Sequence, residues 1–383
     1  MKNPASISLC AAAVGTARSA VPTRLRRAFL GLLALVFVRA FAAPVEITPP
    51  GFSGAQQPQV AVGAKGEIHV VFGQKDGTIF HTVSTDEART FRAPVKIGAL
   101  PKLALGMHRG PRIAVAGGRV VVTAISHEGG DLLAWTSADG GVSWTGPATV
   151  NTAPKSAREG LHAMAGSGER IAVAWLDLRN GGTELWGALS ENGGVSWKPD
   201  ARIYQSPDGS ICQCCAPSLA FGPRGELAAM WRNALGGSRD LYLALSRDGG
   251  GTFAPAEKLG TGTWKLNACP MDGGGLAFAR EGPGAPITVW RRESTLHLAR
   301  PGEPEKTVGE GKDATLTTTA RGPVIAWQSK AGLMLQLPAT APRLLDPQGA
   351  APSLATAPDG RFAIAVWESG EGAQRVLKAE TAR

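Results

Sequence analysis

Cysteine is the residue type whose placement most clearly suggests chemistry in this chain. Three cysteines, Cys212, Cys214 and Cys215, fall within four positions, and a further one, Cys269, lies in the segment N-A-C-P-M-D. An extended backbone would place the side chains of Cys212 and Cys214 on one side and that of Cys215 on the other. The four cysteines lie in the segments that begin two consecutive repeats of the predicted fold. We therefore expect their thiols to lie close together.

Two uses of these cysteines are open. In an exported protein an even number of cysteines indicates disulfides, and Cys214 or Cys215 could pair with Cys269. However, adjacent cysteines close only a strained ring, and cysteines two apart are near the reach limit of a disulfide. The alternative is a soft metal such as Cu(I), which selects thiolates and thioethers. The candidate ligands are Cys212, Cys214, Cys215, Cys269, Met271, His108 and His162, in a spacing unlike the paired C-x-x-C of zinc sites.

Charged residues form a second group of candidates. Arg109, Arg158 and Lys312 stand at the same position before three predicted strand starts and could bind a carboxylate or phosphate. Glu159 and Asp313 directly follow two of these cations, so an ion-paired, solvated rim is the alternative. Further ligand-binding candidates follow a later strand, namely Arg232, Arg239 and Asp240.

Asp272 is a candidate of a different kind. Five of its six counterparts in the other units are apolar. A carboxylate at a position that is otherwise apolar predicts a buried functional acid, which would be catalytic if the protein is an enzyme.

A repeated motif predicts the scaffold that carries these residues. Four segments share a serine, an aspartate or asparagine two residues later, and a final aromatic, and their serines are 53, 53 and 56 residues apart. These side chains can bond nearby backbone amides, so each segment is expected to be a tight turn between strands. The period is typical of a repeat array or a propeller. The paired residues are Ser84 and Asp86, Ser137 and Asp139, Ser190 and Asn192, and Ser246 and Asp248.

The pattern S-x-D-x-G-x-[ST]-[WF] resembles the Asp-box, or BNR repeat, of bacterial sialidases and their non-sialidase relatives. The first copy departs from it at Ala88, where glycine is expected. The resemblance implies an all-β propeller in which the boxes lie at the blade periphery and have a structural role. The segment from Cys212 to Gly275 is similar to exported bacterial sialidase-like propellers that share the C-x-C-C, W-R-N and C-P-M-D-G-G elements.

For a catalytic sialidase the resemblance implies six blades, three arginines, a tyrosine nucleophile and an aspartate acid/base. The chain has two tyrosines, Tyr204 and Tyr242, and neither stands at the opening of an inner strand. No catalytic residue of that family can therefore be transferred to this sequence.

The spacing of strand pairs predicts the number of blades. Seven pairs can be counted between Pro58 and Trp367, and only one strand follows the last. The final blade then needs an outer strand, and residues 44–47 match the outer strand at 94–97. We expect a seven-bladed propeller closed by the N-terminal strand, which hides the sheet edges, with six blades as the alternative. The first residues of the innermost strands would surround one mouth of the central channel.

The N-terminal segment predicts export. Residues 1–42 contain no acid and combine basic residues, an apolar run and a small-residue site before Ala43. This is typical of a secretory signal peptide, and the run is too short to span a membrane. Removing its six basic residues lowers the formal charge from +9 to +3, which argues against nucleic acid as a partner. Residues 43–383 are expected to form a single periplasmic or secreted propeller domain without a transmembrane segment.

Three functional hypotheses follow. The first is a binding or redox module in which the thiols hold a soft metal such as copper or form labile disulfides. The second is a glycoside hydrolase of sialidase type that acts on acidic glycans, with Arg109, Arg158 and Asp272 in its site. The third is a scaffold with an inert channel. The expected partner is a small molecule, a metal ion or a glycan, and the sequence identifies no protein partner.

Overall fold

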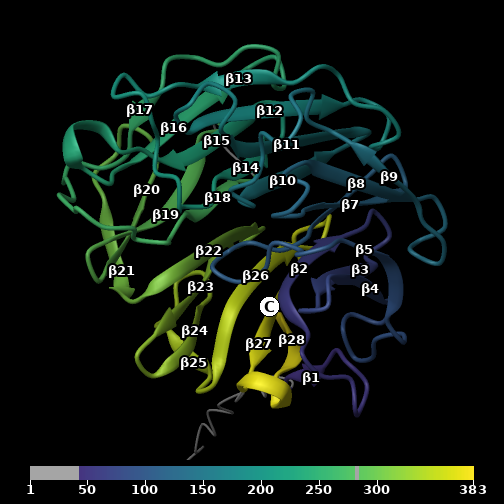
Figure 1. The fold of residues 1–383 in the computed structure, drawn as a ribbon. Coiled ribbons are helices and arrows are strands. Elements are labelled where there is room, and N and C mark those ends of the chain that lie inside the picture. The colour runs from purple at the N-terminus through teal and green to yellow at the C-terminus, as the bar shows by residue number, and fades with distance from the viewer. Residues whose placement is uncertain (1–42, 281–283) are drawn as a thin grey trace, which may run out of the picture. The chain divides into compact units, whose positions relative to one another are not determined.

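A computed structural model describes residues 43–280 and 284–383, and the predicted signal peptide lies outside these residues. The described chain folds into seven four-stranded antiparallel sheets (Figure 1). Its described helices are two short 3-10 turns, Leu235–Gly237 and Gly372–Gln374. The prediction of an all-β fold is confirmed.

Each sheet is one blade, and in six of the seven blades the strands follow one another in sequence from the inside outward. The innermost strands are β2 (Gln56–Val62), β6 (Arg112–Ala116), β10 (His162–Ser167), β14 (Ser218–Phe221), β18 (Gly274–Phe278), β22 (Lys312–Thr319) and β26 (Gly349–Thr356). The second strands are β3 (Ile68–Gly73), β7 (Arg119–Ile125), β11 (Arg170–Asp177), β15 (Leu227–Arg232), β19 (Pro286–Arg292), β23 (Gly322–Ser329) and β27 (Ala363–Ser369).

The outer half of each blade is built in the same way. The third strands are β4 (Thr78–Ser84), β8 (Leu132–Ser137), β12 (Glu184–Ser190), β16 (Leu241–Ser246), β20 (Thr295–Ala299), β24 (Gly332–Gln336) and β28 (Val376–Ala382). The outermost strands are β5 (Val95–Ala99), β9 (Thr145–Thr149), β13 (Ala201–Tyr204), β17 (Glu257–Lys258), β21 (Lys306–Glu310), β25 (Arg343–Asp346) and β1 (Val45–Glu46).

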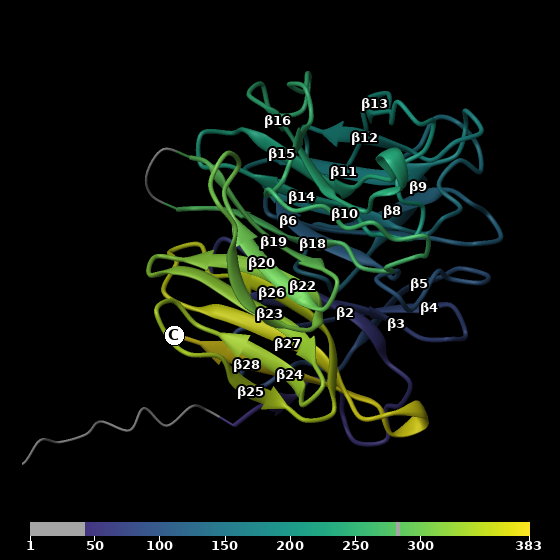
Figure 2. The ribbon, with the colours of Figure 1, turned by 90° about the vertical axis from the view of Figure 1, so that its left-hand side faces the viewer.

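The seven innermost strands form a closed ring. Each contacts the next in the order β2, β6, β10, β14, β18, β22, β26, and β26 contacts β2 again. The last blade is completed by the N-terminal strand, because Val45 of β1 pairs with Ala379 of β28, whose end is the C-terminus (Figure 2). The predictions of seven blades and of closure by residues 44–47 are confirmed, and the six-bladed alternative is wrong.

The second strands supply most of the core between blades. β3, β15 and β27 are buried along their whole length, as apolar runs with cover on both faces should be. Three second strands each carry a tryptophan near their C-terminal end, and all three are completely buried, namely Trp175, Trp231 and Trp367. These large side chains fix how neighbouring blades pack, and removing one would cost about 3–5 kcal/mol.

The four repeated turns connect the third and outermost strands of the first four blades. In the first, the Ser84 hydroxyl donates to Asp86 (2.7 Å) and accepts from the backbone N–H of Ala88 (2.9 Å). The same serine bond is made to Asp139 (2.7 Å), Asn192 (2.9 Å) and Asp248 (2.6 Å). Hydrogen bonds from Thr90 and Ser84 lower the pKa of the exposed Asp86 carboxyl to about 2. Ala88 takes a left-handed φ of 66°, and its glycine counterpart Gly141 has a φ of 94°, a region that glycine adopts without steric cost.

Candidate metal site at the channel mouth

The three clustered cysteines lie in the loop between β13 and β14. The backbone N–H of Cys212 donates to the carbonyl of Arg232, the last residue of β15 (3.0 Å), and the following residues form a turn. The expectation of an extended segment is wrong, because this turn folds Cys215 back toward Cys212. A turn brings residues three apart together, whereas a strand would separate them to opposite faces.

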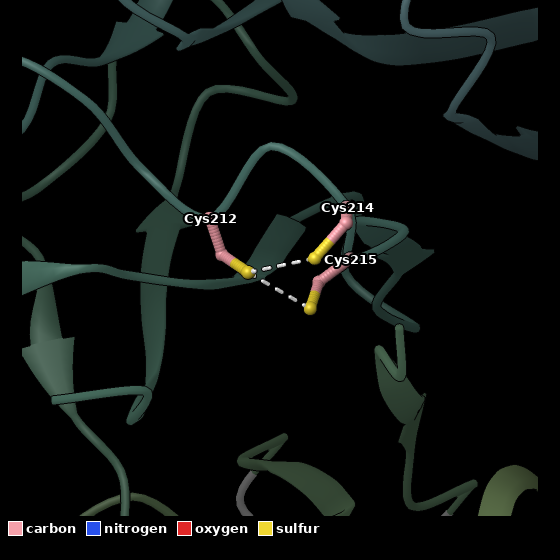
Figure 3. Close-up of side chains that lie close together, drawn as sticks. All are labelled: Cys212, Cys214 and Cys215. Atoms are coloured by element: carbon pink, nitrogen blue, oxygen red, sulfur yellow. Dashed lines mark hydrogen bonds between the residues drawn. The ribbon is translucent and has the colours of Figure 1, made fainter. Parts of the chain in front are cut away.

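The turn directs three sulfur atoms to one point (Figure 3). The Sγ of Cys212 lies 3.0 Å from that of Cys215 and 3.6 Å from that of Cys214. All three sulfurs are within 4.8 Å of one another, and all described cysteines are free thiols. The side chains of Cys212 and Cys215 are buried, and Cys214 is half-buried. This group is called the thiol cluster below.

The surroundings keep these thiols protonated. A hydrogen bond with Cys214 raises the pKa of Cys212 to about 11, and burial raises the pKa of Cys215 to about 12. The pKa of Cys214 also rises to about 12, because Cys215 and burial outweigh the opposing hydrogen bond with Cys212. A metal ion that binds as a thiolate complex must therefore displace protons, so its affinity would increase with pH.

Cys269 and Met271 lie on the neighbouring loop, between β17 and β18. The thiol of Cys269 is exposed, and it contributes to the raised pKa of the Cys214 thiol. Met271 is half-buried with a left-handed φ of 53°, and it immediately precedes the buried Asp272. The predicted meeting of the four thiols is thus seen for three of them, and Cys269 is not part of the group whose sulfurs lie within 4.8 Å of one another.

The two candidate histidines lie elsewhere. His162 is completely buried, and its Nε2 lies 3.0 Å from the hydroxyl of Thr123 in β7. Burial lowers its pKa well below the ordinary value. His108 belongs to a second group of potential ligands with Asp272 and Asp313. Among the described residues, no histidine or carboxylate joins the thiol cluster.

The second group is called the charged cluster below, and it is held by ion pairs. Asp272 is only 2% exposed and pairs with Arg291 (2.6 Å), while His108 pairs with Asp313 (2.8 Å). Burial and the nearby Asp313 raise the pKa of Asp272, although Arg232 and Arg291 oppose the shift. The prediction of a buried acid at position 272 is confirmed in its burial, and a catalytic role stays a prediction.

The buried Arg232 connects the two clusters, because its carbonyl accepts from the N–H of Cys212 and its side chain reaches the loop of Asp272. Arg232 donates from Nε to the carbonyl of Asp272 and from Nη2 to that of Arg291, each at 3.0 Å, and from Nη1 to the carbonyl of Arg239. Asp240 lies beside Arg239 in the loop between β15 and β16, and its carboxylate accepts a hydrogen bond from the backbone N–H of Trp264 (2.8 Å). The candidates Arg232, Arg239 and Asp240 therefore meet as a hydrogen-bonded framework that positions the loops.

The predicted rim cations are more dispersed. Arg109 donates from Nε to the carbonyl of Glu159 (2.7 Å), and the carbonyl of Arg158 lies 3.1 Å from Nδ1 of His127. Lys312 is 54% exposed and lies 3.7 Å from Asp313. The structure thus shows neighbours for each cation but no single point on which the three converge.

A cavity of about 230 Å³ occupies the channel beside the charged cluster. Residues of all seven innermost strands or their openings line it, together with His108, Asp272 and Asp313. None of the four described cysteines is among its lining residues, although Ala216, next to Cys215, is. The thiol cluster is thus at the edge of the channel and the charged cluster inside it.

Two contributors to this site were not predicted from the sequence as site residues. Arg291 neutralises Asp272, and Arg112 donates to the carbonyls of His162 (3.1 Å) and of His108. A buried carboxylate requires a cation, and the two arginines after Trp290 were the available signal. Cys212 and Cys215 have the spacing of a C-x-x-C pair, but their thiols lie close together only because the segment between them forms a turn.

The chain matches no protein-family model. Over 99 residues it is 35% identical to a glycerol kinase of Polaromonas sp. (strain JS666 / ATCC BAA-500), a match that covers 24% of this chain. The chain spans about a fifth of the length of that curated relative. None of the described residues forms a helix with the length and hydrophobicity that a bilayer span needs.

Solved structures are similar over most of the chain. A protein of unknown function from Dyadobacter fermentans is 17% identical, with a TM-score of 0.54 over 90% of this chain and 99% of that one. An α-L-arabinofuranosidase of Fusarium graminearum is 13% identical (TM-score 0.53, coverage 90% and 98%). An intramolecular trans-sialidase of Ruminococcus gnavus is 12% identical, with a TM-score of 0.54 over 90% of this chain and 96% of that one. The chain therefore has the β-propeller fold of the sialidase-type and related proteins, built here from seven blades.

Proposed function

We propose that the protein is an exported binding module that holds a soft metal ion, Cu(I), on Cys212, Cys214 and Cys215. The observation that carries the proposal is the convergence of three sulfur atoms within 4.8 Å at one turn. Metal–thiolate bonds of about 2.3 Å would place three trigonal sulfurs about 4 Å apart. The present separations are 3.0 and 3.6 Å, so Cys212 and Cys215 would need to move apart by about 1 Å and Cys212 and Cys214 by about 0.4 Å.

The ligand set favours Cu(I) over zinc. Thiolates select soft ions such as Cu(I), whereas structural zinc is almost always bound by four ligands. Among the described residues only three sulfurs form the thiol cluster, which is fewer than the four ligands of structural zinc. Because the bound ion would displace the thiol protons, its affinity should increase with pH.

The glycoside hydrolase hypothesis has weaker support. The Nε of Arg109 is bonded to a backbone carbonyl, Arg158 and Lys312 do not line the channel cavity, and Asp272 is paired with Arg291. A substrate carboxylate would therefore find few free guanidinium groups. The similarity to glycosidases at 12–13% identity supports the fold and not the reaction.

The test is competition for Cu(I) between the reduced protein and the chelator bathocuproine disulfonate under anaerobic conditions. We expect one Cu(I) per chain in the wild type. Loss of residues that only support metal ligands costs 10–100-fold, so Cys212→Ser or Cys215→Ser should weaken binding at least about 100-fold. Cys269→Ser is the matched control and should bind within about threefold of wild type, because its sulfur is outside the group.

Other results would point elsewhere. Failure of the reduced wild type to retain copper against the chelator overturns the proposal. Turnover of a chromogenic sialoside or arabinofuranoside that is unaffected by Cys212→Ser would establish the hydrolase hypothesis instead. Circular dichroism and thermal melting of each variant separate a lost ligand from a lost fold.

A further inference from the structure

The three sulfurs of the thiol cluster lie closer together than a planar three-sulfur site requires. They point toward one another (Figure 3), with the Sγ of Cys212 3.0 Å from that of Cys215 and 3.6 Å from that of Cys214. Bonds of about 2.3 Å that meet at about 95°, as in a pyramid with a lone pair at its apex, place the sulfurs about 3.4 Å apart. The observed separations lie on either side of this value, and both are shorter than the planar separation of about 4 Å.

The ligand set of the cluster is three thiols alone. Among the described residues, no histidine or carboxylate has a ligand atom grouped with these sulfurs, and all three cysteines are free. Trivalent arsenic matches such a set, because it is thiophilic, forms three bonds and keeps a lone pair in the fourth direction. A fourth ligand is therefore not needed.

Burial and access at the cluster both suit a small, neutral ligand. Cys212 and Cys215 are 4% and 1% exposed, and charge removed from water must be balanced. Three thiolates on a trivalent centre form a neutral unit, whereas three thiolates on a monovalent ion carry two negative charges. The turn nevertheless lies at the surface, because Gln213 is exposed and Cys214 is half-buried. A small uncharged solute can therefore reach the sulfurs.

We propose that the thiol cluster also binds arsenous acid, the trivalent arsenic oxyacid with three hydroxyl groups, through Cys212, Cys214 and Cys215. At each cysteine an As–S bond forms and an As–O bond breaks, and the hydroxide leaves with the thiol proton as water. Three thiols and one arsenous acid thus give one tris-thiolate arsenic unit and three waters. No electron is transferred, so no oxidant or reductant is consumed. The inference shares the residues of the proposed function but does not require that copper binds.

The test adds sodium arsenite to the reduced full chain under anaerobic conditions, with a phosphine reductant and no competing dithiol. Elemental analysis after gel filtration and titration of the remaining thiols give the stoichiometry. We expect one arsenic per chain and three thiols lost for each arsenic bound. Cys212→Ser, Cys214→Ser and Cys215→Ser should each bind arsenite at least about 100-fold more weakly. Cys269→Ser is the matched control and should bind within about threefold of wild type, because its sulfur is outside the cluster.

Phenylarsine oxide separates a lost ligand from a lost fold, because its arsenic already carries one carbon and takes only two thiols. Cys214→Ser keeps Cys212 and Cys215, whose sulfurs are 3.0 Å apart. This variant should therefore bind phenylarsine oxide within about threefold of wild type while its affinity for arsenite falls. A folded Cys214→Ser that loses both probes, or that binds arsenite as wild type does, overturns the inference.

Competition with copper distinguishes this inference from the proposed function. Wild type saturated with arsenite should take up at least about tenfold less Cu(I), because both ligands use the same sulfurs. Simultaneous binding of the two would place arsenic outside the thiol cluster and overturn the inference. Copper binding without arsenic binding also overturns it and leaves the proposed function in place. Arsenic binding without copper binding supports it and overturns the proposed function alone.

Discussion

The thiol cluster and the charged cluster differ in how fully their polar atoms are already bonded. In the charged cluster, Asp272 pairs with Arg291, and His108 pairs with Asp313. In the thiol cluster, the sulfur atoms contact mainly one another, and thiols form only weak hydrogen bonds. A ligand would have to break strong ion pairs in the first cluster but only weak contacts in the second.

The surrounding charge strengthens this contrast. Arg112, Arg232 and Arg291 all lie around the charged cluster and outnumber its two carboxylates. A divalent cation placed there would meet repulsion at short range. A group of residues of the types that bind metals can therefore be a structural ion-pair network. Whether its ligand atoms are free to bind an ion matters more than how close together they lie.

Removing Asp272 should have the largest effect on stability. Asp272→Ala leaves Arg291 without its partner in a buried setting, and breaking a buried ion pair in this way costs about 3–5 kcal/mol. Urea denaturation of the purified protein measures the change. Copper affinity of the folded, reduced variant should stay within about threefold of wild type, because no thiol is touched.

Glu191→Ala is the control for this prediction. Glu191 pairs with Lys198, but both side chains are more than half exposed (61% and 54%). Exposed pairs contribute about 0–1 kcal/mol, so this variant should be nearly as stable as wild type. A loss below about 1 kcal/mol for Asp272→Ala would contradict the structural role assigned to the charged cluster.

The fold could be predicted from the sequence because its signals are local. Each turn needs serine, aspartate or asparagine, and glycine at fixed offsets, and the buried strands alternate regularly with such turns. The closing strand was also predictable, because a last blade without an outer strand leaves residues 44–47 as the matching segment.

The site was less accessible to prediction because it depends on contacts between distant segments. The turn at Cys212 is set by a hydrogen bond to Arg232, twenty residues later, and local sequence does not specify that bond. Which arginine neutralises Asp272 depends on sheet register, since Gly274 pairs with Trp290 and brings the next residue, Arg291, alongside. Residue types were predictable, but their partners were not.

The ion pair of His108 with Asp313 should give a smaller, pH-dependent effect. Burial disfavours the charged ring, but the hydrogen bond and charge of Asp313 outweigh it and raise the pKa of His108 above 6.5. A raised pKa contributes stability that is present below the unfolded value and is lost as pH rises through the folded value. His108→Gln should therefore cost about 1 kcal/mol near pH 6 and less near pH 9.

Denaturation of His108→Gln and wild type across this pH range measures the difference. His127→Gln is the control for replacing a histidine by glutamine where the ring faces a backbone carbonyl, that of Arg158 (3.1 Å), instead of a carboxylate. A His108→Gln deficit that grows toward alkaline pH would show that the imidazolium is not the species held by Asp313.

Cys214→Ser should change stability least, and it is the sharpest test of the contrast between the clusters. The side chain is half-buried and its thiol contacts are weak, so without metal the free energy of unfolding should stay within about 1 kcal/mol of wild type. Copper should make the stability of wild type and that of Cys214→Ser differ. Free ligand at about 100 times its dissociation constant stabilises a folded protein that binds it by about 2.7 kcal/mol. Wild type should gain that increment and Cys214→Ser should not. An equal gain in both would mean that copper binds outside the thiol cluster, whereas a large loss without metal would make the thiols structural, as the charged cluster is.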